Sequence, residues 1–427
     1  MKTVSCLAAT SLARIGIRVL VGFVLVANLV GCSATTQDGE SAVVEPTPTP
    51  ESVAEDPQTS APGVTAGQIL FGQSAASTGP AGELGQNMEF GIRAAFHEIN
   101  QQGGVHGREL ILLSFDDKYE PELAIANTRK LIEEHGVFAL IGAVGTPTSR
   151  SAVPVAFEAG VPYIAPFTGA EILRNPDLVN VINLRASYYQ ETEEMVERLT
   201  ADLGITRIGV LYQDDSYGRA GYNGVRLALE KRDMEMVSIG VYTRNTTAVK
   251  AALLDLRRGE PEAVIMIGAY NPVAALIKWA RQIDMDAIFM TVSFVGSNAL
   301  AEELGPEGEG VFVTQVVPFP TDRTLPIVKE YLDATRELSS WHDPSFVSLE
   351  GYLAGRLAIA ALQHCGSEPT RQCFLESVRN IGLIDLGGFR LNYEGMNDNQ
   401  GSDEVFLTMI DSDGNYQSVS TLRDVQP

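Results

Sequence analysis

Short apolar runs alternate with segments of helical periodicity through the first part of the chain. Ile69–Gln73, Glu109–Phe115 and Phe138–Ile141 have the length and composition of buried strands. Between them, Gly82–Asn100 and Pro121–His135 carry apolar residues at helical spacing, and glycines follow both segments. This repeated strand–helix pattern predicts a parallel sheet that is covered by helices on both faces.

Hydroxyl-bearing turns follow the third and fourth strands of this series. Thr146 and Pro147 have the order of a helix cap and a first helical residue. Thr168 and Glu171 follow the strand Tyr163–Ala165 with the spacing of a capping box. The sequence therefore predicts two helix N-termini side by side at the carboxyl ends of parallel strands. Open α/β sheets bind small ligands at this place, and exposed backbone N–H groups there favour an anion such as a carboxylate.

A second series of strands and helices begins after Val179–Leu184, which is predicted to be the strand leading out of the first series. Two series of similar size predict two similar α/β lobes. Near the C-terminus, Leu386–Tyr393 and Val405–Ile410 are expected to be antiparallel strands, and Asp413-Gly414 has the form of a hairpin turn. The other predicted strands are Ile208–Tyr212, Met236–Tyr242, Ala263–Ile267, Ile288–Met290 and Gly310–Val317, and the other predicted helices are Gln190–Leu203, Gly218–Lys231, Ala248–Arg257, Pro272–Gln282, Pro326–Thr335 and Phe346–Gln363.

Composition and charge narrow the class of protein. The 427 residues carry a formal net charge of −23, with 20% charged and 45% hydrophobic residues. These fractions are typical of a globular protein with a substantial core, and the length suffices for two domains. The negative charge argues against nucleic acid as a partner and against adhesion to an anionic membrane surface.

The N-terminus predicts export and anchoring. Three basic residues and no acid accompany the apolar run Val19–Val30, which fits a signal peptide and is short for a membrane span. The run ends in Leu-Val-Gly-Cys32, which resembles the lipobox of bacterial lipoproteins, in which the cysteine is lipidated. An uncleaved anchor helix is the alternative. Both interpretations place the remainder outside the cytoplasm, in the periplasm or at the cell surface, attached to a membrane; Ser33 after the cysteine leaves an outer-membrane location open.

Residues 1–31 are therefore predicted to be a lipoprotein signal peptide. Residues 32–66 are rich in Pro, Thr, Ser, Glu and Asp and hold few large apolar side chains. They are expected to form a disordered tether, because they cannot bury enough surface to offset the entropy of ordering.

Cys365 and Cys373 are the two cysteines outside the predicted signal and lipidation site. In an oxidising compartment, two cysteines this close are favoured as a disulfide over free thiols. Without nearby histidines they make a poor zinc site.

Motifs of nucleotide binding and catalysis are missing from the sequence. No G-x-G-x-x-G follows the first strand, and the chain has no Walker A, G-x-S-x-G or H-E-x-x-H sequence. The five histidines lack metal-ligand spacing. We therefore expect no cofactor, no metal and no enzymatic activity, although a catalytic triad is recognised by geometry and an enzyme stays a rival interpretation.

Polar and aromatic residues gather where predicted strands end. Hydroxyls, helix N-termini and aromatic faces from two lobes would together form a cleft for a small polar organic molecule. Each residue also has a structural alternative: the threonines could only cap helices, the tyrosines and Phe167 could be core, and Arg185 could form an ion pair rather than bind a ligand carboxylate. The residues at strand ends are Ser74, Ser77, Asp116, Asp117, Tyr119, Thr146, Thr168, Asp214, Asp215, Tyr217, Tyr270, Ser293 and Phe294.

Several stretches resemble the type I periplasmic binding proteins of branched-chain amino acid ABC transporters, the Leu/Ile/Val-binding family. The resemblance covers most of residues 67–415 and rests on these stretches: STGPAGELGQNMEFGIRAAFHEINQQGGVHGRELILLSFDDKYEP, IGAVGTPTS, PYIAPFTGAEIL, YQDDSYGRAG, MIGAYNP and SFVGSNAL.

The resemblance implies two α/β lobes joined by a three-segment hinge that closes on the ligand. The crossings are expected near Arg185–Tyr189, Val316–Phe319 and Gly401–Val405. Residues 67–187 and 318–403 would then form the first lobe, and residues 188–317 and 404–427 the second.

The resemblance also implies roles for individual residues. The carboxylate-binding hydroxyl falls on Thr146, and the second polar cluster falls on Phe167, Thr168 and Gly169. The aromatic residues of the opposing lobe fall on Tyr217 and Tyr270.

Two positions depart from the family pattern. The acid that neutralises the ligand's ammonium falls on Ser293, which has no charge, and the aromatic wall of the first lobe falls on Leu84. An ammonium would be uncompensated unless Asp214, Asp215 or Glu350 reaches the cleft. Because a buried unpaired cation is costly, a ligand without an ammonium is an alternative to an amino acid.

The function implied is that of a lipid-anchored, monomeric solute-binding protein that delivers an amino acid, or a related carboxylate or amide, to an ABC permease. A receptor domain that uses the same cleft to signal to a membrane sensor is the alternative.

Overall fold

The computed structural model describes residues 61–393 and 398–425. The predicted signal peptide, the lipidation site Cys32 and the predicted tether up to residue 60 lie outside the described residues. Among the described helices, none is both long enough and apolar enough to cross a membrane.

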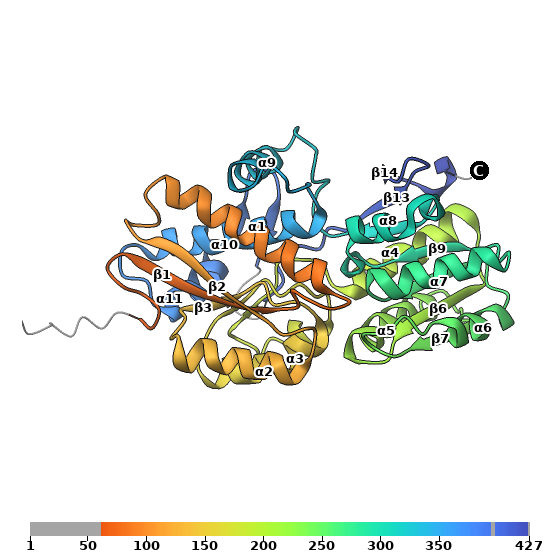
Figure 1. Ribbon diagram of the computed structural model, residues 1–427, viewed down its shortest axis with the longest axis horizontal. Helices are drawn as coiled ribbons and strands as arrows, with labels where there is room; N and C mark the ends of the chain where they lie inside the picture. The colour runs from red at the N-terminus through yellow and green to blue at the C-terminus, as the bar shows by residue number, and fades with distance from the viewer. Residues whose placement is uncertain (1–60, 394–397, 426–427) are drawn as a thin grey trace, which may run out of the picture. The chain divides into compact units, whose positions relative to one another are not determined.

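The first lobe is built on a five-stranded sheet, in which all the pairings are parallel and the strand order is β2-β1-β3-β4-β5 (Figure 1). Phe71 of β1 pairs with Leu112 of β2 on one side and with Ala139 of β3 on the other. The strands are β1 (Gln68–Ala75), β2 (Glu109–Asp116), β3 (Ala139–Ile141), β4 (Tyr163–Ile164) and β5 (Val181–Ile182). The helices that accompany them are α1 (Gly82–Gln101), α2 (Pro121–Arg129, extended by a π-turn at Lys130–Glu134), α3 (Thr146–Glu158), α9 (Pro326–Leu338), α10 (Phe346–Cys365) and α11 (Arg371–Asn380).

The second lobe is built on a seven-stranded sheet with the order β14-β13-β10-β9-β8-β6-β7. Its strands are parallel except for β13 and β14, which are antiparallel to their neighbours. The strands are β6 (Ile208–Gln213), β7 (Ser238–Tyr242), β8 (Ala263–Ile267), β9 (Ile288–Thr291), β10 (Phe312–Gln315), β13 (Phe406–Ile410) and β14 (Tyr416–Val419). The helices are α4 (Tyr188–Glu197, extended by a π-turn at Arg198–Asp202), α5 (Ser216–Glu230), α6 (Lys250–Arg258), α7 (Tyr270–Gln282) and α8 (Ser297–Leu304).

Three segments cross between the lobes, which confirms the predicted fold class. They run from β5 to α4, from β10 to α9, and from the small strand β12 (Arg390–Asn392) to β13. The first and third crossings lie side by side, because the backbone N–H of Asn183 donates to the carbonyl oxygen of Asn399 at 2.7 Å.

The segments Leu386–Tyr393 and Val405–Ile410 both contain antiparallel strands, as predicted, but these strands do not pair with each other. Strand β12 pairs with β11 (Leu383–Asp385) in a separate two-stranded antiparallel sheet, because the chain turns back at Gly387 and Gly388, both with positive φ. Strand β13 instead pairs with β10 and β14. The hairpin turn predicted at Asp413-Gly414 does join β13 to β14.

Ordered structure begins within the stretch that was predicted to be a disordered tether, residues 32–66. The structure describes the last six residues of the predicted tether, and Val64 among them is buried in the core of the first lobe. The carbonyl oxygen of Gly63 accepts a hydrogen bond from the backbone of Leu70 at 2.8 Å. Val64 and the backbone of Gly63 thus tie this stretch to the first lobe although the surrounding composition is polar.

Cys365 and Cys373 are joined in a disulfide, with their Cα atoms 5.8 Å apart. The bond links the last residue of α10 to the first turn of α11.

Candidate ligand-binding site

Thr146 does not cap a helix, contrary to the prediction. The cap of α3 is Gly145, whose φ of 99° lies in the left-handed region that glycine favours, and Thr146 is the first residue of the helix. The Thr146 hydroxyl, which makes no capping bond, points to the turn that follows β4, where its Oγ1 lies 2.6 Å from Oγ1 of Thr168. The N-terminus of α3 and a hydroxyl pair therefore occupy the same place.

The capping box predicted at Thr168 and Glu171 is also wrong. Glu171–Arg174 is a single 3-10 turn that begins after Ala170 and has no side-chain cap. The Thr168 hydroxyl accepts the backbone N–H of Ala170 at 3.3 Å and donates to the Tyr188 hydroxyl at 3.2 Å. Only one of the two expected α-helix N-termini exists here, and hydroxyls take the place of the second.

Gly169 and Phe167 hold this turn against the hinge. The carbonyl oxygen of Gly169 accepts the backbone N–H of Tyr188 at 2.7 Å, and a Cβ at position 169 would lie 2.7 Å from that nitrogen. The backbone of Phe167 bonds to Ala143 and Gly145, which continues the strand pairing into the turn. The glycine is thus required by the close approach of the α4 backbone.

Tyr217 lies in the first turn of α5, on the second lobe. Asp215 caps this helix by accepting the backbone N–H groups of Tyr217 at 2.9 Å and Gly218 at 3.1 Å. The Tyr217 hydroxyl donates to the carbonyl oxygen of Gly268, and its ring centroid lies 4.5 Å from that of Phe294. The capping bonds of Asp215 determine where α5 begins, and the position of its first turn places the Tyr217 ring.

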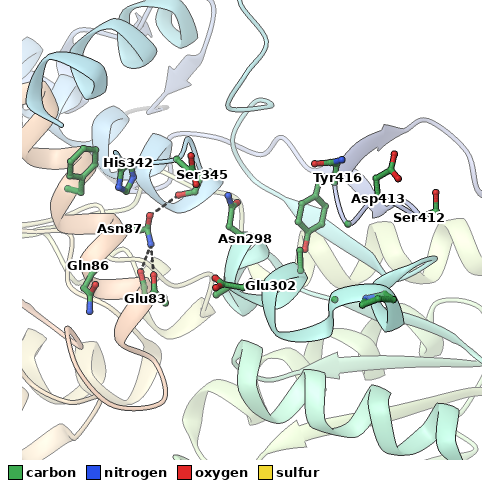
Figure 2. A pocket seen from close by; sticks show the side chains of 18 residues that line it. Glu83, Gln86, Asn87, Asn298, Glu302, His342, Ser345, Ser412, Asp413 and Tyr416 are labelled. Carbon is green, nitrogen blue, oxygen red and sulfur yellow. Dashed lines mark hydrogen bonds between the residues drawn. The ribbon is translucent and has the colours of Figure 1, made fainter. Parts of the chain in front are cut away.

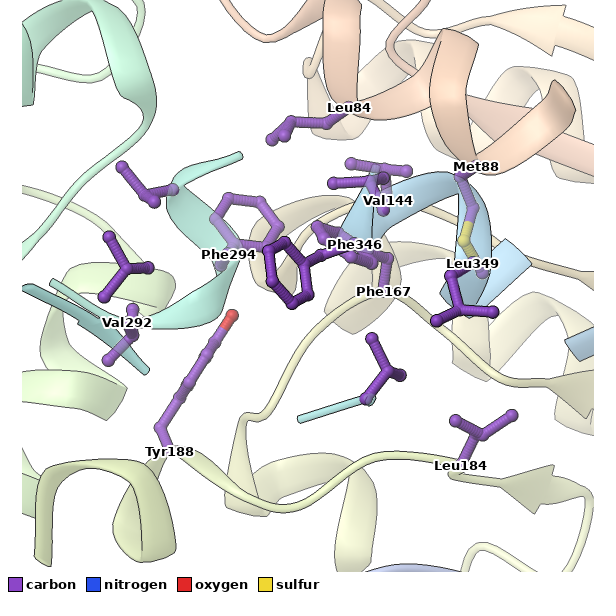
Figure 3. Close-up of a cluster of buried hydrophobic side chains, with 14 of the residues drawn as sticks. Leu84, Met88, Val144, Phe167, Leu184, Tyr188, Val292, Phe294, Phe346 and Leu349 are labelled. Atoms are coloured by element: carbon purple, nitrogen blue, oxygen red, sulfur yellow. The ribbon is translucent and has the colours of Figure 1, made fainter. Parts of the chain in front are cut away.

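Aromatic rings from both lobes meet in one buried cluster (Figure 3). Phe294 of the second lobe lies 5.4 Å from Phe167 of the first lobe, between ring centroids. Tyr188, at the end of the first crossing, lies 5.4 Å from Tyr217. Phe346, at the start of α10, packs instead on Phe319 and Tyr416, with ring centroids 5.3 Å and 6.0 Å apart. Phe167 is therefore buried and also in contact with the opposing lobe. It is both a core residue and a residue of the cleft, which were given as alternatives.

Tyr270 and Leu84 meet at the edge of this aromatic cluster. Tyr270 is the first residue of α7, and its buried hydroxyl faces the backbone of Glu83 at the start of α1. A Cβ on Gly296 would lie 2.5 Å from Leu84 and 3.6 Å from the Tyr270 ring. Leu84 thus fills the space between α1 and the second lobe where an aromatic residue was expected.

Ser293 is held by a buried acid that the sequence analysis missed. Glu191 of α4 accepts the backbone N–H of Ser293 at 2.7 Å, the Ser293 hydroxyl at 3.0 Å and the Thr314 hydroxyl at 2.6 Å. Burial raises the pKa of Glu191, although Arg185 and these donors oppose the shift. The Ser293 hydroxyl also accepts a hydrogen bond from Arg185 of the first crossing.

Arg185 is the buried cation at the centre of the site. Its Nε lies 3.4 Å from Oε1 of Glu350, and its guanidinium lies 4.5 Å above the Phe167 ring. Burial raises the pKa of Glu350 to about 7, and the charge of Arg185 only partly offsets this effect. The structural ion pair considered for Arg185 is thus present, and it lies among the residues expected to bind ligand.

Of the three acids considered as partners for a ligand ammonium, only Glu350 lies in this cluster. Asp215 is committed to capping α5, and Asp214 pairs with Arg219 at the surface. The seven predicted ligand-binding residues are all buried and lie between the lobes: Thr146, Phe167, Thr168, Gly169, Tyr217, Tyr270 and Ser293.

A cavity of about 810 Å³ opens at the edge of the site next to Glu83 (Figure 2). Figure 2 shows Glu83 and Asn87 of α1 on one side and Asn298 and Glu302 of α8 on the other. The amide of Asn298 donates to the carbonyl oxygen of Pro344 at 3.1 Å, so both lobes form the wall. None of the seven predicted ligand-binding residues lines this cavity.

Comparisons with known proteins agree with the two-lobed α/β fold. Residues 68–415 match the sequence model of a family described as periplasmic binding protein. A solved structure of a possible leucine/isoleucine/valine-binding protein from Rhodopirellula baltica SH 1 is 40% identical, with a TM-score of 0.81, over 84% of this chain and 98% of that chain. A substrate-binding periplasmic protein from Ralstonia solanacearum is 26% identical, with a TM-score of 0.78, over 82% of this chain and 100% of that one. The Leu/Ile/Val-binding protein homolog 7 of Brucella abortus (strain 2308) is 25% identical over 308 residues, which cover 69% of this chain and 76% of the relative. All three are named as binding proteins, not as enzymes.

Proposed function

Because this chain belongs to the periplasmic binding protein family, we propose that it captures a small organic carboxylate or amide between its lobes and delivers it to an ABC importer. The observation that carries the proposal is the hydroxyl pair of Thr146 and Thr168, 2.6 Å apart at the N-terminus of α3. Helix N-termini and hydroxyls stabilise a carboxylate, and the facing rings of Tyr217 and Phe294 suit an organic substituent.

We propose a ligand without an ammonium group, because the residue at the family's acid position is Ser293. Ser293 supplies no charge, and its hydroxyl is already bonded to Glu191 and Arg185. An ammonium placed there would meet the Arg185 guanidinium as a like charge, and the nearby carboxylates of Glu191 and Glu350 already lie next to that guanidinium. The Rhodopirellula relative is named a possible leucine/isoleucine/valine-binding protein, so amino acids stay in the ligand class to be tested.

We further propose that the first lobe comprises residues 67–187 and 318–403 and the second residues 188–317 and 404–427, and that the protein is a monomer anchored by a lipid on Cys32. The lobe boundaries agree with the three crossings between the sheets. Cys32→Ser is expected to release the protein from membranes into the soluble extracytoplasmic fraction. Continued membrane association of this variant would favour an uncleaved anchor helix.

Ligand binding is tested by a thermal-shift screen over amino acids, amides, carboxylates and aromatic acids, followed by calorimetry on compounds that stabilise the protein. Thr146→Ala and Tyr270→Ala are each expected to weaken binding by about 1–3 kcal/mol, the scale of a lost buried hydrogen bond or ring contact. Thr335→Ala is the matched control, because Thr335 is a buried threonine of α9 whose hydroxyl bonds to Tyr331 of its own helix. Unchanged ligand affinity in both Thr146→Ala and Tyr270→Ala would refute the assignment of the ligand site to the cleft between the lobes.

A further inference from the structure

The loop between β2 and α2 reaches from the first lobe to the second. Its last residue, Glu120, is the N-cap of α2, yet its side chain makes no capping bond to that helix. The carboxylate instead accepts hydrogen bonds from Nη2 of Arg244 at 2.6 Å and from Nδ2 of Asn245 at 2.7 Å. Both donors lie in the loop that follows β7 of the second lobe.

Sheet topology places this contact far from the crossings. Strand β2 forms one edge of the first sheet, and β5, which leads into the first crossing, forms the opposite edge. Strand β7 likewise forms the edge of the second sheet that is remote from β10 and β13, where the other two crossings attach. A rotation of the lobes about the crossings moves such remote edges furthest, so this contact is sensitive to a small opening.

The backbone on both sides of the contact is strained. Lys118 and Tyr119 have φ values of 53° and 62°, and Asn245 has a φ of 58°, all in the left-handed region. Tyr119 is buried: its ring lies over Gly145 at the start of α3, and its hydroxyl lies near Asp215 of the second lobe. Contacts with the second lobe therefore support a loop conformation that is costly by itself.

We propose that Glu120, Arg244 and Asn245 form a clasp that holds the two lobes together on the side opposite the hinge. One carboxylate with two donors has more directional restraint than a single surface ion pair. The side chains of Arg244 and Glu120 are 24% and 39% exposed, so the clasp is accessible to salt and can open without unfolding either lobe. This role concerns the lobes themselves and is independent of the ligand's identity.

The test measures the distance between the lobes in the full-length, ligand-free protein. Spin labels at Glu133→Cys on the first lobe and Leu254→Cys on the second report this distance by pulsed electron paramagnetic resonance. Both positions are exposed and lie outside the clasp. In the protein with the intact clasp, we expect a population of molecules with a short distance between the two labels. This population should fall about 3- to 10-fold in Glu120→Gln and in Arg244→Gln, because the charge-assisted pair is lost.

Asn245→Asp is a second variant, which places a carboxylate opposite Glu120 and is expected to deplete the short-distance population in the same way. Glu230→Gln is the matched control, because it breaks the Arg226–Glu230 pair within the second lobe; its distances should equal those of the parent protein. Identical distance distributions in the parent and in all three clasp variants would overturn the proposal. Because the experiment uses ligand-free protein, this result would not contradict the proposed ligand-binding site.

Discussion

Replacing Glu191 with alanine tests the buried charge cluster around this residue, which was not predicted from the sequence. Its carboxylate accepts three hydrogen bonds from Ser293 and Thr314 and lies close to Arg185. Each lost bond contributes about 1 kcal/mol, and the loss also leaves buried donors unsatisfied and a buried cation with less compensation. We therefore expect Glu191→Ala to lower the free energy of unfolding by about 3–5 kcal/mol.

Glu191→Gln separates charge from shape. The glutamine keeps the volume and one acceptor but turns an amide donor towards groups that already donate, so we expect a loss of about 1–3 kcal/mol. Glu194→Gln is the control on the same helix: its partner Arg198 is partly exposed, and the change should stay within about 0.5 kcal/mol. Urea unfolding followed by circular dichroism measures all three. A loss below about 1 kcal/mol in Glu191→Ala at unchanged m-value would refute this account of the charge cluster.

Three further variants address other features. Burial raises the pKa of Glu350 from 4.5 to about 7, so the folded state binds the carboxyl proton more tightly than the unfolded state does. The protonated carboxyl therefore contributes at most about 3 kcal/mol to the free energy of unfolding. This contribution is present at acid pH and is lost as the pH rises through 7. Glu350→Gln should flatten the dependence of the urea midpoint between pH 5 and 8, and an unaltered slope would contradict the shift. Replacing Cys365 and Cys373 by alanine together should cost about 2–3 kcal/mol for a loop this short, and an unchanged melting temperature would argue against a stabilising bond. Gly169→Ala should lower the melting temperature, because its Cβ would lie 2.7 Å from the backbone of Tyr188; full stability would mean that the turn can move aside.

The βα units were predictable because each of them is local. An apolar run, a glycine-bearing turn and a helical periodicity lie within one short stretch, and the predicted strand Ala263–Ile267 has the observed bounds. Antiparallel pairing near the C-terminus was not predictable in this way, since β13 pairs with β10, which is distant in sequence. Helix α11 was missed because its sequence is mostly polar and few of its residues are buried.

The site was predictable in its residues but not in its contacts. Thr146 and Thr168 stand out because each follows a strand, but their 2.6 Å contact and the cap at Gly145 depend on the backbone angles of the turns. Glu191 is one of four acids in α4, a composition typical of an exposed helix. Its burial follows from the packing of α4 against β10, a relation that no local pattern encodes.

Neither lobe is a continuous piece of chain, and this bears on how the protein is made. Strand β10 obtains its antiparallel neighbour only from β13, close to the C-terminus, and helices α9 to α11 of the first lobe follow β10 in sequence. A nascent chain therefore completes neither lobe until synthesis is nearly finished. Truncation after residue 400 would leave the edge of β10 unpaired, a template for aggregation in place of a native sheet.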